Sequence, residues 1–362
     1  MAGLCWMAVT LGLLLSVGKS VDTFERPTNG QLRDIVNDLW NRYRPSYEVK
    51  KDGKDSRRYP MFSLAVSIPY NNNKKMYDVS QVIDSADDVK NLILRCEVYR
   101  GTRVVAATVL RWPNVLDQCP NERVKWPDVL KTCGRSSMTW AEVKRDCPHA
   151  VHDGKADHAE NRTLQNFDTL TNNRNQNDFL LFYVLASPCG ERCTNQGNPR
   201  NILNGINEIK RWNNYAVVFS DVFQPRSGEP VPEENLIRAL EQLGTYDGPL
   251  GPIGLKYIFR CDGSRCSSCS MGDTGTVTRF CYTDKPKPGP SHNLPSSSFI
   301  LPQRGRSDSP SRSGQGGRDQ KNNNINKNAG VSTNVGGNSG GVVGQGNSGG
   351  GQWRQGRGKK GK

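Results

Sequence analysis

The chain of 362 residues lacks any apolar segment long enough to span a bilayer. Residues 4–17 form an apolar run, but a spanning helix needs roughly 20 residues. This run is followed by the small residues Gly18 and Ser20, and the residues before it include no Lys or Arg. A short apolar run with small residues behind it is typical of a secretory signal peptide. We therefore predict a signal peptide over residues 1–20 and a soluble, secreted mature protein with no membrane span.

A strong charge is also lacking in most of the chain. The net charge is +14, yet residues 285–362 contain thirteen Lys or Arg against two Asp and contribute +11. Lys19 adds +1, which leaves +2 for residues 21–284. The tail is rich in Gly, Ser, Asn and Arg and poor in core-forming residues, so we expect residues 285–362 to be disordered. Such a tail binds polyanions through its charge or serves only to solubilise the protein.

Cysteine is abundant, with eleven residues in the chain. Cys5 lies in the predicted signal peptide, and Cys189 and Cys193 belong to a motif described below. The other eight form an even set, which predicts four disulfides in an oxidising compartment; the spacing does not fix their connectivity. They are Cys96, Cys119, Cys133, Cys147, Cys261, Cys266, Cys269 and Cys281. Cys266 and Cys269 could also form half of a second zinc site. No second His/Cys pair completes such a site, which favours disulfides there.

The most informative motif is His158-Ala159-Glu160, which 27 intervening residues separate from Pro188-Cys189, with Cys193 after it. One imidazole and two thiolates can hold a zinc ion whose fourth position stays open for water. Glu160 is not itself a ligand, and it stands where a proton carrier is needed. The alternatives are a surface histidine at a helix start and disulfides, either between Cys189 and Cys193 or from them to other cysteines.

The segments around this motif predict a helix, a buried strand and a turn, in that order. Asp157 is the expected N-cap of a helix through residues 161–170, which places Leu164, Phe167 and Leu170 on one face. Residues 179–186 form a continuous apolar run that suits a strand buried on both faces. The cysteines then follow the carboxyl end of that strand.

Other elements are expected along the rest of the chain. A first helix begins with a capping box at Thr28 and Gln31 and ends before Pro45. Further helices are expected from Asn198-Pro199 onward and from Pro232 to Gly244. Strands are expected at residues 61–69, 92–99, 104–112, 215–223 and 253–260, the second and third as a hairpin about Gly101. Residues 113–150 contain three cysteines and several prolines and predict a disulfide-stapled insertion.

His-x-Glu with Pro-Cys-x-x-Cys is the pattern of zinc-dependent nucleobase deaminases. The chain resembles the cytidine deaminase superfamily over about residues 28–261, and most closely its secreted AID/APOBEC-like deaminases. Here three residues rather than two separate Cys189 from Cys193. The resemblance implies an α/β, three-layer fold over residues 21–284, with a mixed central sheet of about five strands flanked by helices. A helical crossover makes the final two strands parallel, as in the polynucleotide-editing branch.

The resemblance also implies the chemistry. Zinc on His158, Cys189 and Cys193 activates a water, and Glu160 carries protons while the amino-bearing carbon of the base is attacked. The backbone groups of Ala159 and Ser187 flank the base. Phe223 either stacks on the base or packs in the core.

Two departures separate the chain from many polynucleotide editors. Residues 220–224 stand in the place of the family's specificity loop but lack its Arg-Leu-Tyr-Tyr type of sequence, and Ala186 replaces a Trp. Asn161-Arg162-Thr163 is a glycosylation sequon beside Glu160, where the fold is expected to prevent modification.

Two hypotheses for the function follow. The first is a secreted, zinc-dependent hydrolase that deaminates cytosine in nucleic acid or nucleosides, in extracellular defence. The second is a non-catalytic secreted binding protein that keeps the deaminase scaffold and binds polyanions or microbial surfaces through its tail. The intact His158, Glu160, Cys189 and Cys193 favour the first. The choice among DNA, RNA and nucleosides, and between cytosine and adenine, stays open.

Overall fold

The computed structural model describes residues 25–51, 53–225, 229–272 and 275–283. The predicted signal peptide and the tail from residue 285 lie outside these residues. Within the described ranges, no helix is both long and apolar enough to cross a bilayer.

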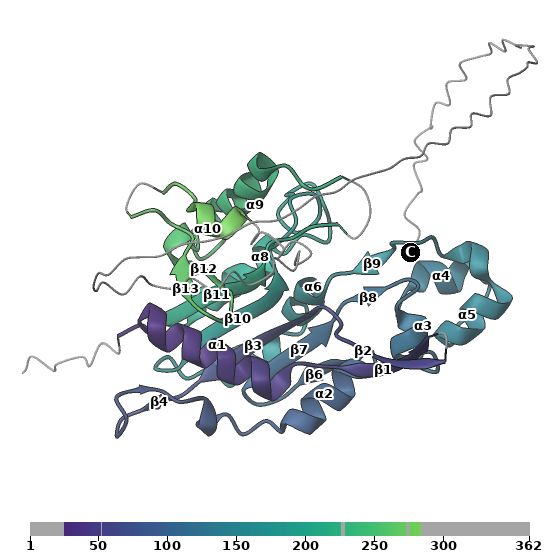
Figure 1. Cartoon of the computed structure of the whole chain (residues 1–362), viewed down its shortest axis with the longest axis horizontal. Coiled ribbons are helices and arrows are strands. Elements are labelled where there is room, and N and C mark those ends of the chain that lie inside the picture. Colours follow the sequence, from purple (N-terminus) through teal and green to yellow (C-terminus); the bar gives the residue numbers. More distant parts are fainter. Residues whose placement is uncertain (1–24, 52, 226–228, 273–274, 284–362) are drawn as a thin grey trace, which may run out of the picture. The chain divides into compact units, whose positions relative to one another are not determined.

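The core is built on a seven-stranded mixed sheet with the order β13-β12-β11-β10-β3-β7-β6 (Figure 1). Strands β10, β11 and β12 are parallel to one another, and the other pairs are antiparallel. The bounds are β3 Phe62–Ile68, β6 Val98–Arg100, β7 Val104–Thr108, β10 Phe179–Ala186, β11 Asn214–Asp221, β12 Ile258–Cys261 and β13 Cys266–Ser268. The predicted α/β class with a helix-flanked mixed sheet is confirmed, and so is the parallel pairing across the helical crossover.

Both faces of the sheet are covered by helices, which makes three layers. Alternate residues of β10 point to opposite sides, so Leu180 and Phe182 join one apolar cluster and Phe179 and Leu181 join the other. The first cluster receives side chains from α6 Ala159–Leu164, α7 Asp168–Asn172, α8 Leu203–Asn207 and α9 Glu233–Thr245. The second receives them from α1 Asn29–Tyr43 and α2 Ala86–Leu94.

The segment between β8 Leu110–Arg111 and β9 Ala156–Asp157 forms a separate small core. Its helices are α3 Val115–Gln118, α4 Pro127–Thr132 and α5 Trp140–Asp146. They pack around Trp126 and Trp140, whose rings meet edge to face at 4.7 Å between centroids. Disulfides Cys96–Cys119 and Cys133–Cys147 staple this segment, and Cys261–Cys266 and Cys269–Cys281 lie near the end of the described chain. The expectation of four disulfides among these eight cysteines is confirmed.

Several expected boundaries were wrong, for local reasons. The strand expected at residues 92–99 begins as the last turn of α2, over residues 92–94, because Ser85 caps α2 and its Val89 and Ile93 pack on the sheet. Only the short β6 remains of it. The strand expected from residue 253 begins at Ile258, since Leu255–Tyr257 forms the 3₁₀ turn η4. The sheet has seven strands rather than about five because the short β6 and β13 extend its edges.

The helix that follows the predicted N-cap also differs. His158, not Asp157, occupies the N-cap position of α6, and Asp157 belongs to β9. The expected single helix over residues 161–170 is divided into α6 and α7. The capping box at Thr28 is present: its Oγ1 accepts from the Gln31 amide at 3.3 Å, and Gln31 Oε1 accepts from the Thr28 amide at 2.9 Å.

The remaining described elements are short. They are β1 Tyr47–Lys51, β2 Lys54–Arg58, β4 Tyr70–Asn71, β5 Met76–Tyr77, η1 Val79–Gln81, η2 Pro148–Ala150, η3 Glu208–Arg211 and α10 Arg279–Tyr282.

Candidate active site

Two elements bring the three predicted ligands together. His158 stands at the start of α6, while Cys189 and Cys193 lie in the turn after the carboxyl end of β10. His158 Nδ1 is 3.2 Å from Cys193 Sγ and 3.9 Å from Cys189 Sγ, and the two sulfurs are 3.4 Å apart. Tetrahedral zinc with its usual bond lengths would require about 3.6 Å between N and S and about 3.8 Å between the sulfurs. The donor set therefore fits a zinc ion.

The same distances speak against the alternative pairing of the cysteines. A disulfide requires its sulfurs at about 2.05 Å, and Cys189 and Cys193 are the free cysteines of the described chain. Both are buried, at 7% and 1% exposure. The amide of Cys193 donates to the Cys189 carbonyl at 3.2 Å, and the amide of Ile202 donates to the Cys193 carbonyl at 2.9 Å. The pair thus has its own turn, and α8 begins only at Leu203.

Glu160 lies in the first turn of α6 and reaches into this cluster. Its Oε1 is 3.0 Å from Cys193 Sγ and 3.5 Å from His158 Nδ1, and its side chain is 12% exposed. Burial raises the pKa of the Glu160 carboxyl, but hydrogen bonding and the charge of His158 outweigh burial and leave this pKa below its usual value. The carboxylate is therefore ionised.

Burial and mutual hydrogen bonds shift the pKa values of the imidazole and of both thiols in this cluster. Burial favours the neutral imidazole, but hydrogen bonds to Cys189 and Glu160 outweigh it and raise the pKa of His158 to about 10. The hydrogen bond from Cys193 outweighs burial and, with His158, lowers the pKa of Cys189 to about 4. The hydrogen bond to Cys189 and burial raise the pKa of Cys193. The Cys189 thiolate and the Glu160 carboxylate are the negative charges of this cluster. A divalent cation bound there would neutralise them.

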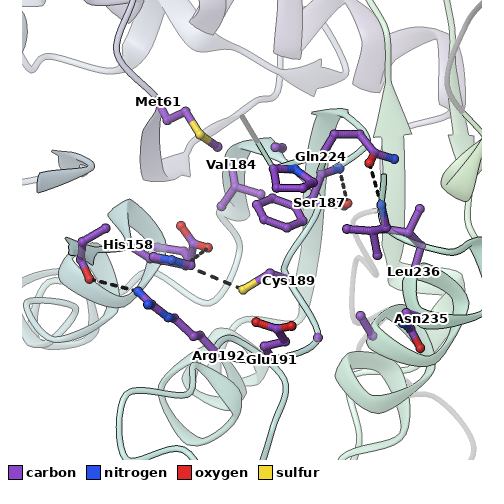
Figure 2. A pocket seen from close by; sticks show the side chains of 18 of the residues that line it. Met61, His158, Val184, Ser187, Cys189, Glu191, Arg192, Gln224, Asn235 and Leu236 are labelled. Carbon is purple, nitrogen blue, oxygen red and sulfur yellow. Dashed lines mark hydrogen bonds and ion pairs between the residues drawn. The ribbon is translucent and has the colours of Figure 1, made fainter. Parts of the chain in front are cut away.

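A cavity of about 800 Å³ opens above the cluster (Figure 2). Six of the seven predicted site residues line it: His158, Ala159, Glu160, Ser187, Cys189 and Phe223. The seventh, Cys193, lies behind them. Ser187 Oγ accepts from the Phe223 amide at 2.9 Å, which fixes the segment after β11 beside the end of β10. Phe223 lines the cavity and also packs against the core.

Several residues of the cavity wall were not among the predicted site residues, although Gln224 falls within residues 220–224, which stand in the place of the family's specificity loop. Gln224 Oε1 accepts from the Val231 amide at 2.9 Å and so joins the two ends of one loop (Figure 2). Asn235 and Gln242 of α9 also line the cavity, and Asn235 lies on the side opposite Met61 (Figure 2). Their signal was weak, because single amide residues after a strand or on a helix are common. Loops at the carboxyl ends of parallel strands are nevertheless where ligands bind in α/β sheets.

Asp157 connects distant segments of the chain through its carboxylate, a role that was not predicted from its position in the sequence. Its Oδ2 accepts from Trp126 Nε1 at 2.8 Å, and its Oδ1 accepts a close hydrogen bond from Arg200 Nη1. Trp126 belongs to the disulfide-stapled segment, and Arg200 follows the cysteine turn. The carboxylate of Asp157, the residue before His158, thus connects the stapled segment to the segment after the cysteines.

The sequon is engaged within the fold. Asn161 Nδ2 donates to the Arg200 carbonyl at 3.1 Å, and the hydroxyl of the fully buried Thr163 donates to the Ser63 carbonyl at 3.4 Å. The folded chain therefore offers this asparagine little room for a glycan.

Comparison with known proteins supports the resemblance in the motif. Residues 140–285, less than half of the chain, match the family model of Secreted Novel AID/APOBEC-like Deaminase 1. No curated protein and no solved structure matches the chain. The matched segment contains His158, Glu160, both cysteines and the parallel half of the sheet. Residues 140–285 are therefore similar to the AID/APOBEC-like deaminases of the secreted type.

Proposed function

We propose that this protein is a secreted, zinc-dependent hydrolase that converts cytosine to uracil in nucleic acid or nucleosides. The observation that carries the proposal is the position of Glu160, whose carboxylate lies within 3.5 Å of two metal-ligand candidates at the base of a large cavity. A purely structural zinc site uses a closed set of four ligands. Here three candidates gather, and a carboxylate stands beside them.

The residues divide the work between holding the metal and moving protons. His158 Nδ1 and the sulfurs of Cys189 and Cys193 would hold the zinc. When bound, zinc supplies a Lewis acid that lowers the pKa of water at its open position. Glu160 accepts the proton of the attacking water and delivers protons to the ring nitrogen and to the amino group. Water thus adds to the base and ammonia leaves.

The cavity walls orient the base and limit its contact with solvent. Val184, Phe223 and Leu236 supply apolar surface around the reacting ring. The Ser187 hydroxyl fixes Phe223 through the backbone, so its effect on the base is indirect. The four disulfides support an oxidising, extracellular setting.

The deciding experiment compares Glu160→Gln with Glu191→Gln, a matched change of an exposed carboxylate that lines the same cavity. We expect the wild type to carry one zinc per chain and to release uracil from at least one of single-stranded DNA, RNA, cytidine and deoxycytidine. Glu160→Gln should keep its zinc and lose activity by 10²-fold or more, on the order of the contribution of general acid–base catalysis. Glu191→Gln should remain active.

Two outcomes would contradict the proposal. Metal analysis that finds no zinc in the folded wild type would remove the metal site. A zinc-loaded wild type that forms no uracil from any of the four substrates would favour the non-catalytic binding protein instead.

A further inference from the structure

A two-stranded ribbon stands apart from the rest of the fold. Strands β1 and β2 pair with each other, in the register Tyr47↔Arg58 to Lys51↔Lys54, and are not part of the seven-stranded sheet (Figure 1). All five residues of β2 are exposed. An isolated two-stranded hairpin is marginally stable in water. Since it adds little to the core, the ribbon requires another explanation.

The two faces of the ribbon differ in charge. Successive residues of a strand alternate between faces, and partners across the ladder share a face. One face is neutral: Arg57 Nη2 is 3.1 Å from Glu48 Oε1, and Lys50 lies opposite Asp55.

The other face, which we call the cationic ribbon face, comprises Tyr47, Val49, Lys54, Ser56 and Arg58. Its described side chains include two cations and no carboxylate. The side chains of Lys54 and Arg58 form no ion pair or hydrogen bond with another described residue, whereas Glu48 and Asp55 lie on the neutral face.

This segment holds the positive charge of the body of the chain. Residues 44–58 contain six Lys or Arg against three Asp or Glu, a net charge of +3. Residues 21–284 together carry +2, so the remainder of the body is slightly negative. This local excess of positive charge favours the approach of a polyanion to the ribbon.

The ribbon leads directly to the cavity. Arg58 is followed by Tyr59 and Pro60 and then by Met61 and Phe62, both of which line the cavity. Three residues span at most about 11 Å. Phosphates along one nucleic acid strand rise by about 3.4 Å per nucleotide in B-form DNA. The cationic ribbon face thus begins within a few nucleotides of a base placed in the cavity.

Aromatic rings lie between the cationic ribbon face and the cavity. The Arg44 guanidinium lies 3.7 Å from the ring centroid of Tyr59 and 4.5 Å from that of Trp40. Trp40 in turn lies 5.7 Å from Phe62. Tyr59 is 46% exposed, so its ring offers a surface on which a base can stack.

We propose that the cationic ribbon face binds the phosphates of a single-stranded polynucleotide whose target base occupies the cavity. This inference rests on the proposed deaminase function and extends it, since it names a polynucleotide rather than a free nucleoside as the substrate. A nucleoside carries no phosphate and cannot use Lys54 or Arg58. A single strand combines a phosphate chain with unpaired bases that can stack on Tyr59 and enter the cavity.

The test compares two double variants of the full chain in a Glu160→Gln background, which removes turnover. Lys54→Ser/Arg58→Ser alters the cationic ribbon face, and Lys50→Ser/Arg57→Ser removes the same charge from the neutral face. Binding of a fluorescent single-stranded oligonucleotide is measured by anisotropy over a range of salt concentrations. The basic tail contributes equally to both variants, so the difference between them reports the ribbon.

We expect Lys54→Ser/Arg58→Ser to lower the magnitude of the salt slope, log K against log salt, by about 1.4 and to weaken binding about 25-fold at 0.1 M salt. The control should leave the slope unchanged. Tyr59→Ala should weaken binding, and Tyr59→Phe should restore it. If the enzyme is active, Lys54→Ser/Arg58→Ser should lower kcat/KM for the oligonucleotide and not for deoxycytidine.

Failure of the proposed function would be seen separately, as an absence of uracil from every substrate, and it leaves the binding comparison intact. Equal oligonucleotide binding by the two double variants would overturn the inference. It would also be overturned if heparin distinguished the two variants as strongly as the oligonucleotide does, because the ribbon would then be a general polyanion site.

Discussion

Replacement of Asp157 by Ala should destabilise the domain, because the buried indole of Trp126 loses its hydrogen-bond acceptor. Trp126 is 1% exposed, and its Nε1 donates to Asp157 Oδ2 at 2.8 Å. Without that carboxylate, the N–H group is left buried and unpaired, which costs about 1–3 kcal/mol. The ion pair with Arg200 is half in solvent, with side-chain exposures of 21% and 53%, and adds about 0.2–1 kcal/mol. The expected loss of unfolding free energy is about 1–4 kcal/mol.

Replacement by Asn separates the two contributions. An amide oxygen can still accept from Trp126, so Asp157→Asn should lose only the charge and cost less than about 1 kcal/mol. Urea unfolding, followed by tryptophan fluorescence, measures both variants. Asp153→Ala, an exposed Asp near the same strand, is the control and should be close to neutral.

A double-mutant cycle with Trp126→Phe then isolates the contact. We expect a coupling energy of about 1–3 kcal/mol between Asp157→Ala and Trp126→Phe. Because Asp157 directly precedes His158, Asp157→Ala should also speed the transfer of zinc to a chelator. Equal destabilisation by Ala and Asn, or a coupling below about 0.5 kcal/mol, would refute the reasoning.

Three further predictions concern other parts of the chain. Hydrogen bonds from Lys74 and Ser80 hold the pKa of Asp78 well below its usual value, so its contribution to stability is complete above about pH 4–5 and is lost as the pH falls further. Urea unfolding between pH 5 and pH 3 should show a steeper loss for the wild type than for Asp78→Asn, and parallel curves would contradict this. Peptide mass spectrometry of protein from a secretory host should find Asn161 without a glycan; a fully occupied site in active protein would contradict its packing. Cys189→Ser should lose zinc and unfold at lower urea, and a variant that retains full zinc would remove Cys189 from the ligand set.

The local parts of the site followed from the sequence. His158-Ala159-Glu160 and the two cysteines were recognisable because each residue type has a specific chemistry and the apolar residues 179–186 marked a buried strand between them. The capping box of α1 was equally local. In such cases the decisive contacts lie within a few positions of the residue or depend on hydrophobic period alone.

The expectations that failed depended on distant partners. Asp157 resembled an N-cap, but Trp126 and Arg200 engage its carboxylate across 31 and 43 positions. Residues 92–94 suit a strand as well as a helix, and packing of Val89 and Ile93 on the sheet decided for the helix. The wall formed by Gln224, Asn235 and Gln242 arises only when α9 returns along the sheet. Periodicity does not encode such encounters.

The order of the strands shows that the segment matched by the family model is smaller than the unit that can fold. The matched segment, residues 140–285, supplies β10 to β13, but the antiparallel neighbour of β10 is β3, which lies far upstream. An excised segment of this kind would end in a bare edge formed by Phe179–Ala186, a row of apolar residues with unpaired backbone groups. Arg162 would also lose the Cys96 and Thr108 carbonyls to which it donates. We therefore expect residues 140–285 expressed alone to aggregate, and any minimal domain has to include the upstream strands.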